Sequence, residues 1–385
     1  MKRFIRLAVG VGAAVGLSAW VAPVAAGAEG VPHGGPFFGE GANHAVFVQT
    51  DNSAGNQVVA YDRADNGALT LANTYNTGGL GGVLNGSAVD HLASQGSLTY
   101  DRANALLYAV NAGSNTVSVF SVRGDQLSLR EVVNSGGVFP VSVAVHDDLV
   151  YVLNAENGGN VQGYFAFFGR LFPLPKSNRS LGLTIPSDTT QFTNTPGQVA
   201  FSPDGSRLIV TTKANGNDID IFRVGFFGQL STSPVVNTEP GTVPFAVTFD
   251  QAGHLVVANA GTNALATYTL NPNGTVALID AVGTGQPATC WVAPAHGYFY
   301  ASNAGGPSLS GYQSAANGQL TLIGQTSTDP GTVDASASVD GQFLYVQTGG
   351  SGIVDEFQVG VGGALTGVGS VTVAGAIGGE GIVAF

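Results

Sequence analysis

The residues best suited to acid–base chemistry are one histidine and two carboxylates. Asp90 and His91 are adjacent, and Glu380 lies near the C-terminus. A histidine beside a carboxylate can act as a general base near neutral pH and activate a water molecule as a nucleophile. Adjacent side chains of a strand point to opposite sides, so this pair needs a loop to act together. We predict His91, Asp90 and Glu380 as catalytic residues of a hydrolase, with a solvated loop histidine as the alternative.

A second set of polar residues could bind a neutral ligand. Asparagines and glycines recur just after short apolar segments, where turn formation alone is the alternative explanation. The segment 176–195 is long for a link without regular structure, which is typical of a lid or a binding loop. The predicted ligand-binding residues are Gln95, Asn111, Asn154, Gln198, Lys213, Asn259, Asn303 and Asp334.

The motifs favour no cofactor. No P-loop, GxSxG, HExxH or EF-hand pattern occurs. Asp218 and Asp220 would share one face of a strand and could help to bind calcium, but the further oxygen ligands of a calcium site are missing from the sequence. Cys290 is the single cysteine, so the chain has no internal disulfide. It lies in an apolar segment, and we expect it to be buried and unreactive.

Composition excludes several classes of protein. The chain has 385 residues, of which 57 are glycine and 10% are charged, so it is too glycine-rich and charge-poor for a helical bundle. Apolar residues make up 44%, enough for a large core. The 13 Lys and Arg stand against 25 Asp and Glu, a net charge of −12. This acidic balance argues against a nucleic-acid partner, because phosphate binding needs clustered cations.

Residues 1–28 resemble a secretory signal peptide, with cations at positions 2, 3 and 6, an apolar run over 7–21 and a small-residue cleavage site at 26–28. An uncleaved membrane anchor is the alternative, but the run is shorter than the ~20 residues of a helical span. Cleavage removes three positive charges and no acid, which changes the net charge from −12 to −15. We therefore expect a secreted, extracellular chain that does not contact a membrane after cleavage.

Internal repeats predict the fold. A short apolar strand recurs seven times at intervals of 43 to 61 residues, and each copy precedes a strand that ends in an aromatic residue and a turn. The centres of the seven copies are Phe47, Tyr108, Tyr151, Ile209, Val256, Tyr300 and Tyr345. A four-stranded unit of about 45 residues is typical of a β-propeller blade. We predict an all-β fold, a seven-bladed propeller over residues 45–385 that follows a Gly-rich leader at 29–44.

The first repeat lacks its inner strand, and the C-terminal segment 381–385 has the pattern of that strand. We therefore predict that the C-terminus closes the ring. In such a blade, the loops between the second and third strands lie on the same face as the links that enter each new blade. That face carries the predicted site residues, so we expect it to be the functional one.

Three segments, 111–120, 201–208 and 317–322, resemble the seven-bladed lactonase family. That family includes the propeller-type 6-phosphogluconolactonases and the carboxymuconate-cyclising enzymes. The resemblance covers about residues 45–385 and implies a lactonase-like propeller. Active members carry His and Arg in a Pro-Arg-His type of pattern where an inner strand opens. The corresponding segments 139–142, 195–198, 243–246 and 286–289 contain neither, so the resemblance implies no catalytic residue here.

Three functional hypotheses remain open from the sequence. The first is a secreted binding or interaction scaffold whose Asn-rich face binds a neutral carbohydrate, a lactone or a protein. The second is an exported lactone hydrolase that acts on a non-phosphorylated lactone. The third is a metal-stabilised structural protein. In each case we expect a monomer.

Overall fold

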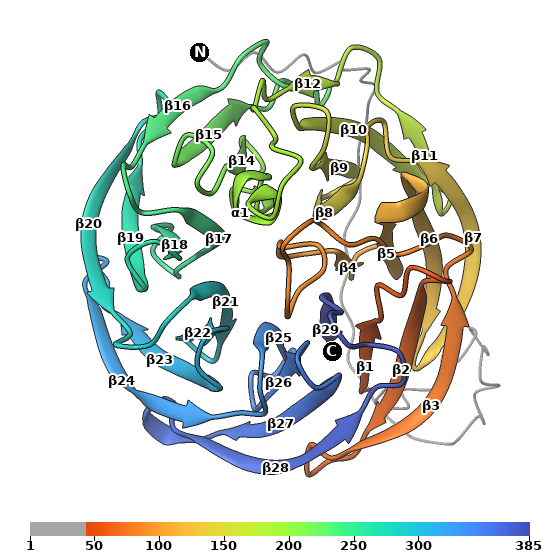
Figure 1. The fold of residues 1–385 in the computed structure, drawn as a ribbon, viewed down its shortest axis with the longest axis vertical. Helices are drawn as coiled ribbons and strands as arrows, with labels where there is room; N and C mark the ends of the chain where they lie inside the picture. The colour runs from red at the N-terminus through yellow and green to blue at the C-terminus, as the bar shows by residue number, and fades with distance from the viewer. Residues whose placement is uncertain (1–43) are drawn as a thin grey trace, which may run out of the picture. The chain divides into compact units, whose positions relative to one another are not determined.

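The computed structural model describes residues 44–385, which form seven four-stranded antiparallel blades arranged in a ring (Figure 1). The predicted all-β seven-bladed propeller is confirmed. The predicted signal peptide and most of the Gly-rich leader lie outside the described residues. Within the described part of the chain, no helix has the length and apolar character that crossing a membrane requires.

Each blade runs from an inner strand at the channel to an outer strand at the rim. Blade 1 contains β29 (Ile382–Ala384), β1 (Ala45–Gln49), β2 (Gln57–Arg63) and β3 (Leu69–Asn76), and blade 2 contains β4 (Leu98–Asp101), β5 (Leu106–Asn111), β6 (Thr116–Arg123) and β7 (Gln126–Asn134). Blade 3 contains β8 (Pro140–His146), β9 (Leu149–Asn154), β10 (Asn160–Phe167) and β11 (Arg170–Pro173), with β12 (Arg179–Ser180) also paired to β10. Blade 4 contains β13 (Val199–Phe201), β14 (Arg207–Thr211), β15 (Asp218–Arg223) and β16 (Val235–Thr238).

The remaining three blades follow the same order. Blade 5 contains β17 (Pro244–Phe249), β18 (Leu255–Asn259), β19 (Ala264–Leu270) and β20 (Val276–Gly283). Blade 6 contains β21 (Thr289–Ala295), β22 (Tyr298–Asn303), β23 (Ser308–Ser314) and β24 (Leu320–Ser327). Blade 7 contains β25 (Thr332–Ala337), β26 (Phe343–Thr348), β27 (Ile353–Val359) and β28 (Leu365–Thr372). Short helical turns occur at η1 (Ala112–Ser114), α1 (Gln191–Asn194) and η2 (Val361–Gly363).

The C-terminal strand closes the ring, as predicted. β29 pairs antiparallel with β1, placing Phe47 opposite Val383. Ala45 and Phe385 exchange two backbone hydrogen bonds, of 3.2 and 3.0 Å. The first and last segments of the described chain therefore share one sheet, and β29 supplies the inner strand that completes blade 1.

The second strands form the centre of the core, since apolar side chains fill both of their faces; all six residues of β5 are buried. Three of these strands carry a tyrosine whose hydroxyl donates to a glycine carbonyl oxygen in the outer hairpin of the next blade. The pairs are Tyr151 with Gly228 at 2.7 Å, Tyr300 with Gly363 at 2.8 Å and Tyr345 with Gly67 at 2.7 Å. These glycines have positive φ, which the tight hairpin requires. The repeated tyrosine therefore fixes one blade against the next.

Candidate functional site

The link between β3 and β4, residues 77–97, crosses one mouth of the central channel (Figure 1). Ser94 Oγ donates to the carbonyl oxygen of Val141 in blade 3 at 2.9 Å. From blade 6, Trp291 Nε1 donates to the carbonyl oxygen of Ser94 at 2.6 Å, and Gln95 Nε2 donates to that of Val292 at 3.0 Å. Blades 3 and 6 lie on different sides of the ring, so the link spans the channel. We call residues 77–97 the plug.

The sequence pointed to a different link as the lid. Residues 176–195 form β12, which pairs with β10 of blade 3, and α1, which contacts the plug: Asn85 N donates to Gln191 Oε1 at 2.8 Å, and Phe192 N donates to the carbonyl oxygen of Asn85 at 3.3 Å. Of the two long links, the plug is the one whose hydrogen bonds reach both blade 3 and blade 6, and a lid role of residues 176–195 stays an untested prediction. The role of the plug depends on contacts with distant blades, which its own composition does not reveal.

A cavity of about 430 Å³ occupies the channel beneath the plug. Gln95, Gln198 and Asp334 lie among its lining residues at the plug end. Its other lining includes His146 and Pro203, which belong to the hairpins between first and second strands. The cavity therefore extends to the hairpin face, opposite to the face that we expected to be functional. The plug is the physical reason, because it occupies the mouth on the predicted face.

A carboxyl pair lies at the closed end of this cavity. Glu380 is 0% exposed, and its Oε1 accepts a hydrogen bond from Gly96 N of the plug at 2.9 Å. Burial, together with the charge of Asp334, raises the pKa of Glu380 well above its usual value. Burial also raises the pKa of Asp334 to about 7, although hydrogen bonds, including one from Glu380, oppose the shift. The buried Glu380 Oε2 accepts no hydrogen bond from residues 44–385, which disfavours the ionised form of Glu380 in the same direction as burial.

Two further carboxyl groups, those of Asp51 and Asp90, lie near this pair. Asp51 Oδ2 accepts the backbone N–H of Glu380 at 2.8 Å, and burial raises the pKa of Asp51 to about 8. Asp90 accepts N–H groups of Leu92 and Ser94 at 2.7 and 2.8 Å. Burial raises the pKa of Asp90 to about 6, against these hydrogen bonds and the charge of the lysine described next. Asp90 therefore shapes the turn of the plug.

Lys213 is the cation of this cluster, and its ammonium group is fully engaged. Nζ donates to the carbonyl oxygens of Ala93 and Phe192 at 2.6 and 2.5 Å, and to Thr195 Oγ1 at 3.0 Å. Burial lowers its pKa to about 7, while the negative charge of Asp90 opposes that shift. The three donors of an ammonium are thus all used, and the predicted contact of Lys213 with a ligand is left without a free donor.

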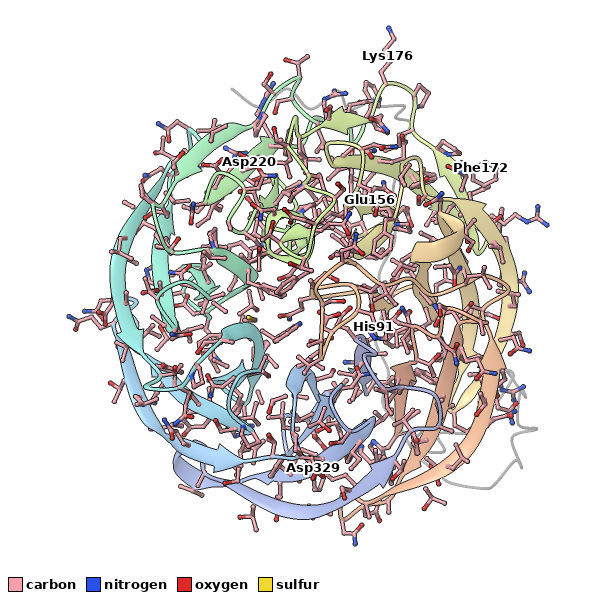
Figure 2. The ribbon with its side chains drawn as sticks, in the orientation of Figure 1. His91, Glu156, Phe172, Lys176, Asp220 and Asp329 are labelled. Carbon is pink, nitrogen blue, oxygen red and sulfur yellow. The ribbon has the colours of Figure 1, made fainter. Side chains whose placement is uncertain are left out.

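The structure does not form the predicted His91–Asp90 pair. The carboxylate of Asp90 turns back onto the plug backbone, whereas the ring of His91 lies against Gly378. Figure 2 shows His91 near the centre of the ring. Burial lowers the pKa of His91, but His91 is not among the residues that line the channel cavity. Of the predicted catalytic residues, Glu380 is the one placed against the cavity-lining Asp334.

The asparagines do not form the exposed rim that we expected, because each lies at the buried end of a second strand. Asn111 Nδ2 donates to Thr116 and Ser118, and Asn303 Nδ2 donates in the same way to Ser308 and Ser310. Asn154 and Asn259 are buried as well, and Asn154 Nδ2 donates to the backbone of a neighbouring turn. Their amides hold the loops to the blades, and ligand binding by them stays an untested prediction.

The two predicted ligand-binding glutamines differ in whether a side-chain amide atom is left available to a ligand. Gln95 exchanges both of its amide hydrogen bonds with the backbone of Val292. Gln198 Oε1 accepts the N–H of Val247 at 2.6 Å, and its Nε2 has no hydrogen-bond partner among residues 44–385. Since Gln198 lines the channel cavity, this amide can donate to a ligand there.

The two aspartates of β15 make separate contacts. Asp218 accepts a hydrogen bond from Thr238 Oγ1 at 2.6 Å, and burial, with the charge of Asp218 as the lesser cause, raises the pKa of Asp220 to about 7. In the described part of the chain, no group of three or more His, Cys, Asp or Glu residues could hold a metal ion. Calcium binding stays an untested prediction, and the reaction centre proposed below does not require it.

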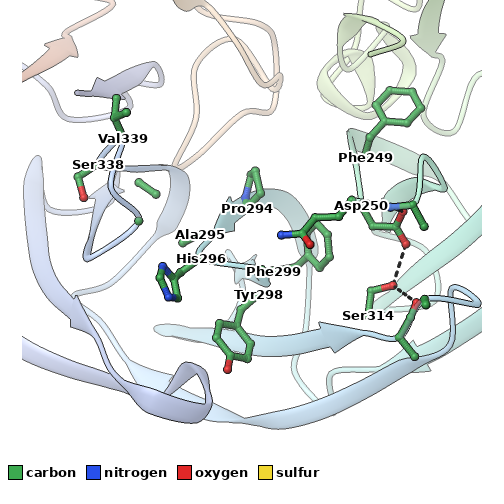
Figure 3. Close-up of a pocket in the computed structure, with 17 residues that line it drawn as sticks. Phe249, Asp250, Pro294, Ala295, His296, Tyr298, Phe299, Ser314, Ser338 and Val339 are labelled. Atoms are coloured by element: carbon green, nitrogen blue, oxygen red, sulfur yellow. Dashed lines mark hydrogen bonds between the residues drawn. The ribbon is translucent and has the colours of Figure 1, made fainter. Parts of the chain in front are cut away.

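A larger cavity of about 530 Å³ lies on the hairpin face among blades 5, 6 and 7 (Figure 3). Asp250 Oδ2 accepts hydrogen bonds from His254 Nδ1 at 2.8 Å and from Ser314 Oγ at 2.9 Å. The carboxylate therefore lies between the histidine and the serine. A hydrolytic triad needs the histidine in contact with the serine, so this group lacks the order required to activate Ser314.

Comparisons with known proteins place the fold. No protein-family model and no curated protein sequence matches the chain. Among solved structures, a 6-phosphogluconolactonase-like protein from Bacteroides uniformis is 18% identical, with a TM-score of 0.70 over 89% of this chain and 99% of that chain. The periplasmic gluconolactonase of Pseudomonas aeruginosa is 17% identical, with a TM-score of 0.68 over 89% and 98%. A protein from Lactobacillus plantarum is 20% identical, with a TM-score of 0.69 over 89% and 99%. The chain thus has the propeller fold of 6-phosphogluconolactonase-like proteins.

Proposed function

We propose that this chain is an exported hydrolase of neutral lactones, with its reaction centre at the closed end of the channel. The observation that carries the proposal is the Asp334–Glu380 carboxyl pair: Asp334 lines a cavity large enough for a small ligand, Glu380 is buried beside it, and burial raises the pKa of both. Paired carboxyls whose pKa values are displaced by burial are typical of acid–base sites.

The chemistry follows from the protonation of this pair. Ionised Asp334 accepts a proton from water, whose oxygen attacks the lactone carbonyl carbon, while Gln198 Nε2 donates to the carbonyl oxygen as negative charge develops there. The ring C–O bond then breaks, and the proton returns from Asp334 to the leaving alkoxide. The products are an open hydroxy acid and the regenerated carboxylate. Glu380 keeps its own proton throughout and holds the pair at a single negative charge.

Charge favours a neutral substrate. The one lysine near the pair is bound to protein acceptors, and four carboxyl groups make the closed end a poor place for a phosphate. A sugar lactone without phosphate fits this balance, and the fold neighbour described as a periplasmic gluconolactonase supports that substrate class. The signal-like residues 1–28 support export.

The scaffold hypothesis loses the feature that motivated it. It required an exposed face of asparagine amides, and the four asparagines are buried and mostly hydrogen-bonded within the blades. We therefore prefer the hydrolase, which uses side chains that line a cavity.

The test is hydrolysis of glucono-δ-lactone by the full chain, measured above the spontaneous rate. Asp334→Asn is expected to lower kcat by about a hundredfold or more, because the general base is lost. The matched control is Asp355→Asn, which removes another buried carboxyl of blade 7 that does not line the channel. The wild-type rate should rise with pH through about 7, as Asp334 ionises.

Full activity of a folded Asp334→Asn variant would refute the proposal, as would a wild-type chain without activity on any neutral lactone. His91→Ala is expected to leave the rate unchanged, since His91 does not line the cavity. Preference for 6-phosphogluconolactone over the unphosphorylated lactone would contradict the charge argument.

A further inference from the structure

Six phenylalanines are exposed on the outer hairpins of two neighbouring blades. Phe168, Phe226 and Phe227 at the hairpin tips are 84%, 96% and 74% exposed, values that are unusual for such large apolar side chains. Figure 2 shows Phe172 at the outer rim of the ring. The aromatic surface consists of Phe165, Phe167, Phe168, Phe172, Phe226 and Phe227.

The two hairpins share a sequence that the other blades lack. Blade 3 carries Phe-Phe-Gly-Arg-Leu at 167–171, and blade 4 carries Phe-Phe-Gly-Gln-Leu at 226–230. The corresponding hairpins of the other five blades have no phenylalanine before the turn glycine or at the turn. Since the glycine and the leucine satisfy the turn and the core, the paired phenylalanines serve no evident folding purpose.

Contacts between the blades bring the two hairpins together. Phe165 in β10 lies opposite both Leu149 of β9 and Phe172 of β11. The side chain of Leu149 in turn lies against Gly228, where an added Cβ would come within 2.4 Å of it. The hairpin that carries Phe226 and Phe227 is therefore seated against the sheet that carries the other four phenylalanines. Its tip rings pack on each other, with centroids 5.0 Å apart.

Cations lie beside this surface in an otherwise acidic chain. Arg170 is the cross-strand partner of Phe167, and the side chain of Arg130 lies 3.6 Å from the position of a Cβ on Gly169. Lys176 is exposed at the rim of the ring, and Arg223 is exposed at the end of β15. No Lys or Arg follows Arg223 in the sequence, whereas nine Asp and Glu do. Blades 5 to 7, residues 244–372, contain seven Asp and Glu and no Lys or Arg, whereas blades 3 and 4, residues 140–238, which carry the phenylalanines, contain six Lys and Arg and seven Asp and Glu.

We propose that the aromatic surface docks onto a lipid membrane that contains anionic lipids. Exposed aromatic side chains enter the boundary between headgroups and acyl chains, while neighbouring Arg and Lys attract anionic headgroups. The acidic blades 5 to 7 would be repelled by the same membrane, which fixes the orientation with blades 3 and 4 toward the lipid. This proposal departs from our expectation that the exported chain avoids membranes, and it is independent of the proposed hydrolase activity.

A second copy of the chain fits the surface less well. A two-fold contact brings the same patch of both chains together, so the exposed Arg170, Lys176 and Arg223 of both copies would be brought close to one another. An anionic lipid surface supplies the opposite charge instead. Charge complementarity therefore selects the lipid.

The experiment measures co-sedimentation of the full chain with vesicles of phosphatidylcholine alone and of phosphatidylcholine mixed with phosphatidylglycerol. We expect stronger binding to the mixed vesicles, weakened by salt. The triple variant Phe168→Ser, Phe226→Ser and Phe227→Ser is expected to lose about tenfold or more of that binding. The control is Val361→Ser, since Val361 is fully exposed at the equivalent hairpin of blade 7.

A local reporter separates this surface from residues 1–28. In the Phe227→Trp variant, the emission of the added tryptophan is obtained by subtracting the spectrum of the unsubstituted chain. This emission should shift to the blue on mixed vesicles and be quenched by brominated acyl chains. Val361→Trp should show neither effect. Equal binding by the triple variant, or an unshifted Phe227→Trp spectrum, would overturn the proposal. So would self-association that is abolished by the triple variant, because that result assigns the surface to a second copy.

Discussion

Replacing Asp51 with asparagine is expected to stabilise the protein near neutral pH and to have much less effect in mild acid. Asp51 follows β1 and is 1% exposed. Its carboxyl accepts hydrogen bonds from Glu380 N at 2.8 Å and from Gln49 Nε2. Burial nevertheless raises its pKa to about 8, and the negative charge of Asp90 adds to the shift. Asparagine keeps an acceptor oxygen for the same N–H group and has no charge to bury.

The magnitude follows from proton linkage. In the unfolded chain an aspartate has a pKa of about 3.9, so between about pH 4 and pH 8 the folded state holds a proton that the unfolded state has lost. The stability that this proton contributes is fully present below the unfolded pKa and is lost as pH rises through the folded pKa. Each pH unit in this window costs about 1.4 kcal/mol, so about 3 kcal/mol is lost between about pH 5 and pH 7. The variant does not suffer this loss.

Denaturant unfolding of both proteins at about pH 5 and pH 7 measures the effect, as the change in the variant-minus-wild-type free energy of unfolding. We expect a change of about 2 to 3 kcal/mol in favour of the variant at the higher pH. The control is Asp65→Asn, which removes an exposed carboxylate. A difference that is the same at both pH values would refute the reasoning, because it would show that the folded Asp51 is already ionised in mild acid.

Two further predictions concern the closing strand and the cysteine. Deleting residues 381–385 removes β29 and the Phe385 ring, which stacks on Tyr100 with 4.6 Å between the ring centroids. The lost apolar contacts are worth about 2 kcal/mol for each large side chain, so the deletion should lower the Tm measured by calorimetry by many degrees. An unchanged Tm would show that ring closure by β29 is unimportant for stability. Cys290 is half-buried by surface area, but its thiol is enclosed enough that burial raises its pKa to about 12. A disulfide reagent at mildly alkaline pH should therefore label the denatured chain and leave the native chain unlabelled, and rapid native labelling would show that the thiol is accessible.

The fold could be predicted because each blade is formed by a contiguous stretch of sequence. Its four strands are consecutive in the sequence, so the repeat length and the aromatic markers report the architecture directly. Ring closure was also predictable, because an incomplete first repeat and a spare C-terminal strand imply each other. The plug could not be found in this way, since its path is set by hydrogen bonds from Ser94 and Gln95 to residues far away in the sequence.

The asparagines carried a signal that could have been used. Asn111 is followed after five and seven residues by Thr116 and Ser118, and Asn303 is followed at the same distances by Ser308 and Ser310. A polar set that recurs at fixed positions of a structural repeat indicates a structural role, and the structure shows the corresponding hydrogen bonds. Asp334 and Glu380 were both selected from the sequence, but with separate roles, because nothing local indicates that β25 and the segment before β29 bring them together.

The buried carboxyls differ in the hydrogen bonds that they supply to the fold. Asp90 and Glu380 accept hydrogen bonds from N–H groups of the plug. These hydrogen bonds offset part of the free energy that burying the two carboxyls costs, and they hold the plug in place. Asp334 lines the cavity and accepts N–H groups of Ala335 and Ile382. An asparagine would keep one acceptor oxygen for these N–H groups without the cost of burying a charge. The proposed reaction, in contrast, needs a carboxyl at position 334, because it requires a group that takes and returns a proton at the wall of the cavity.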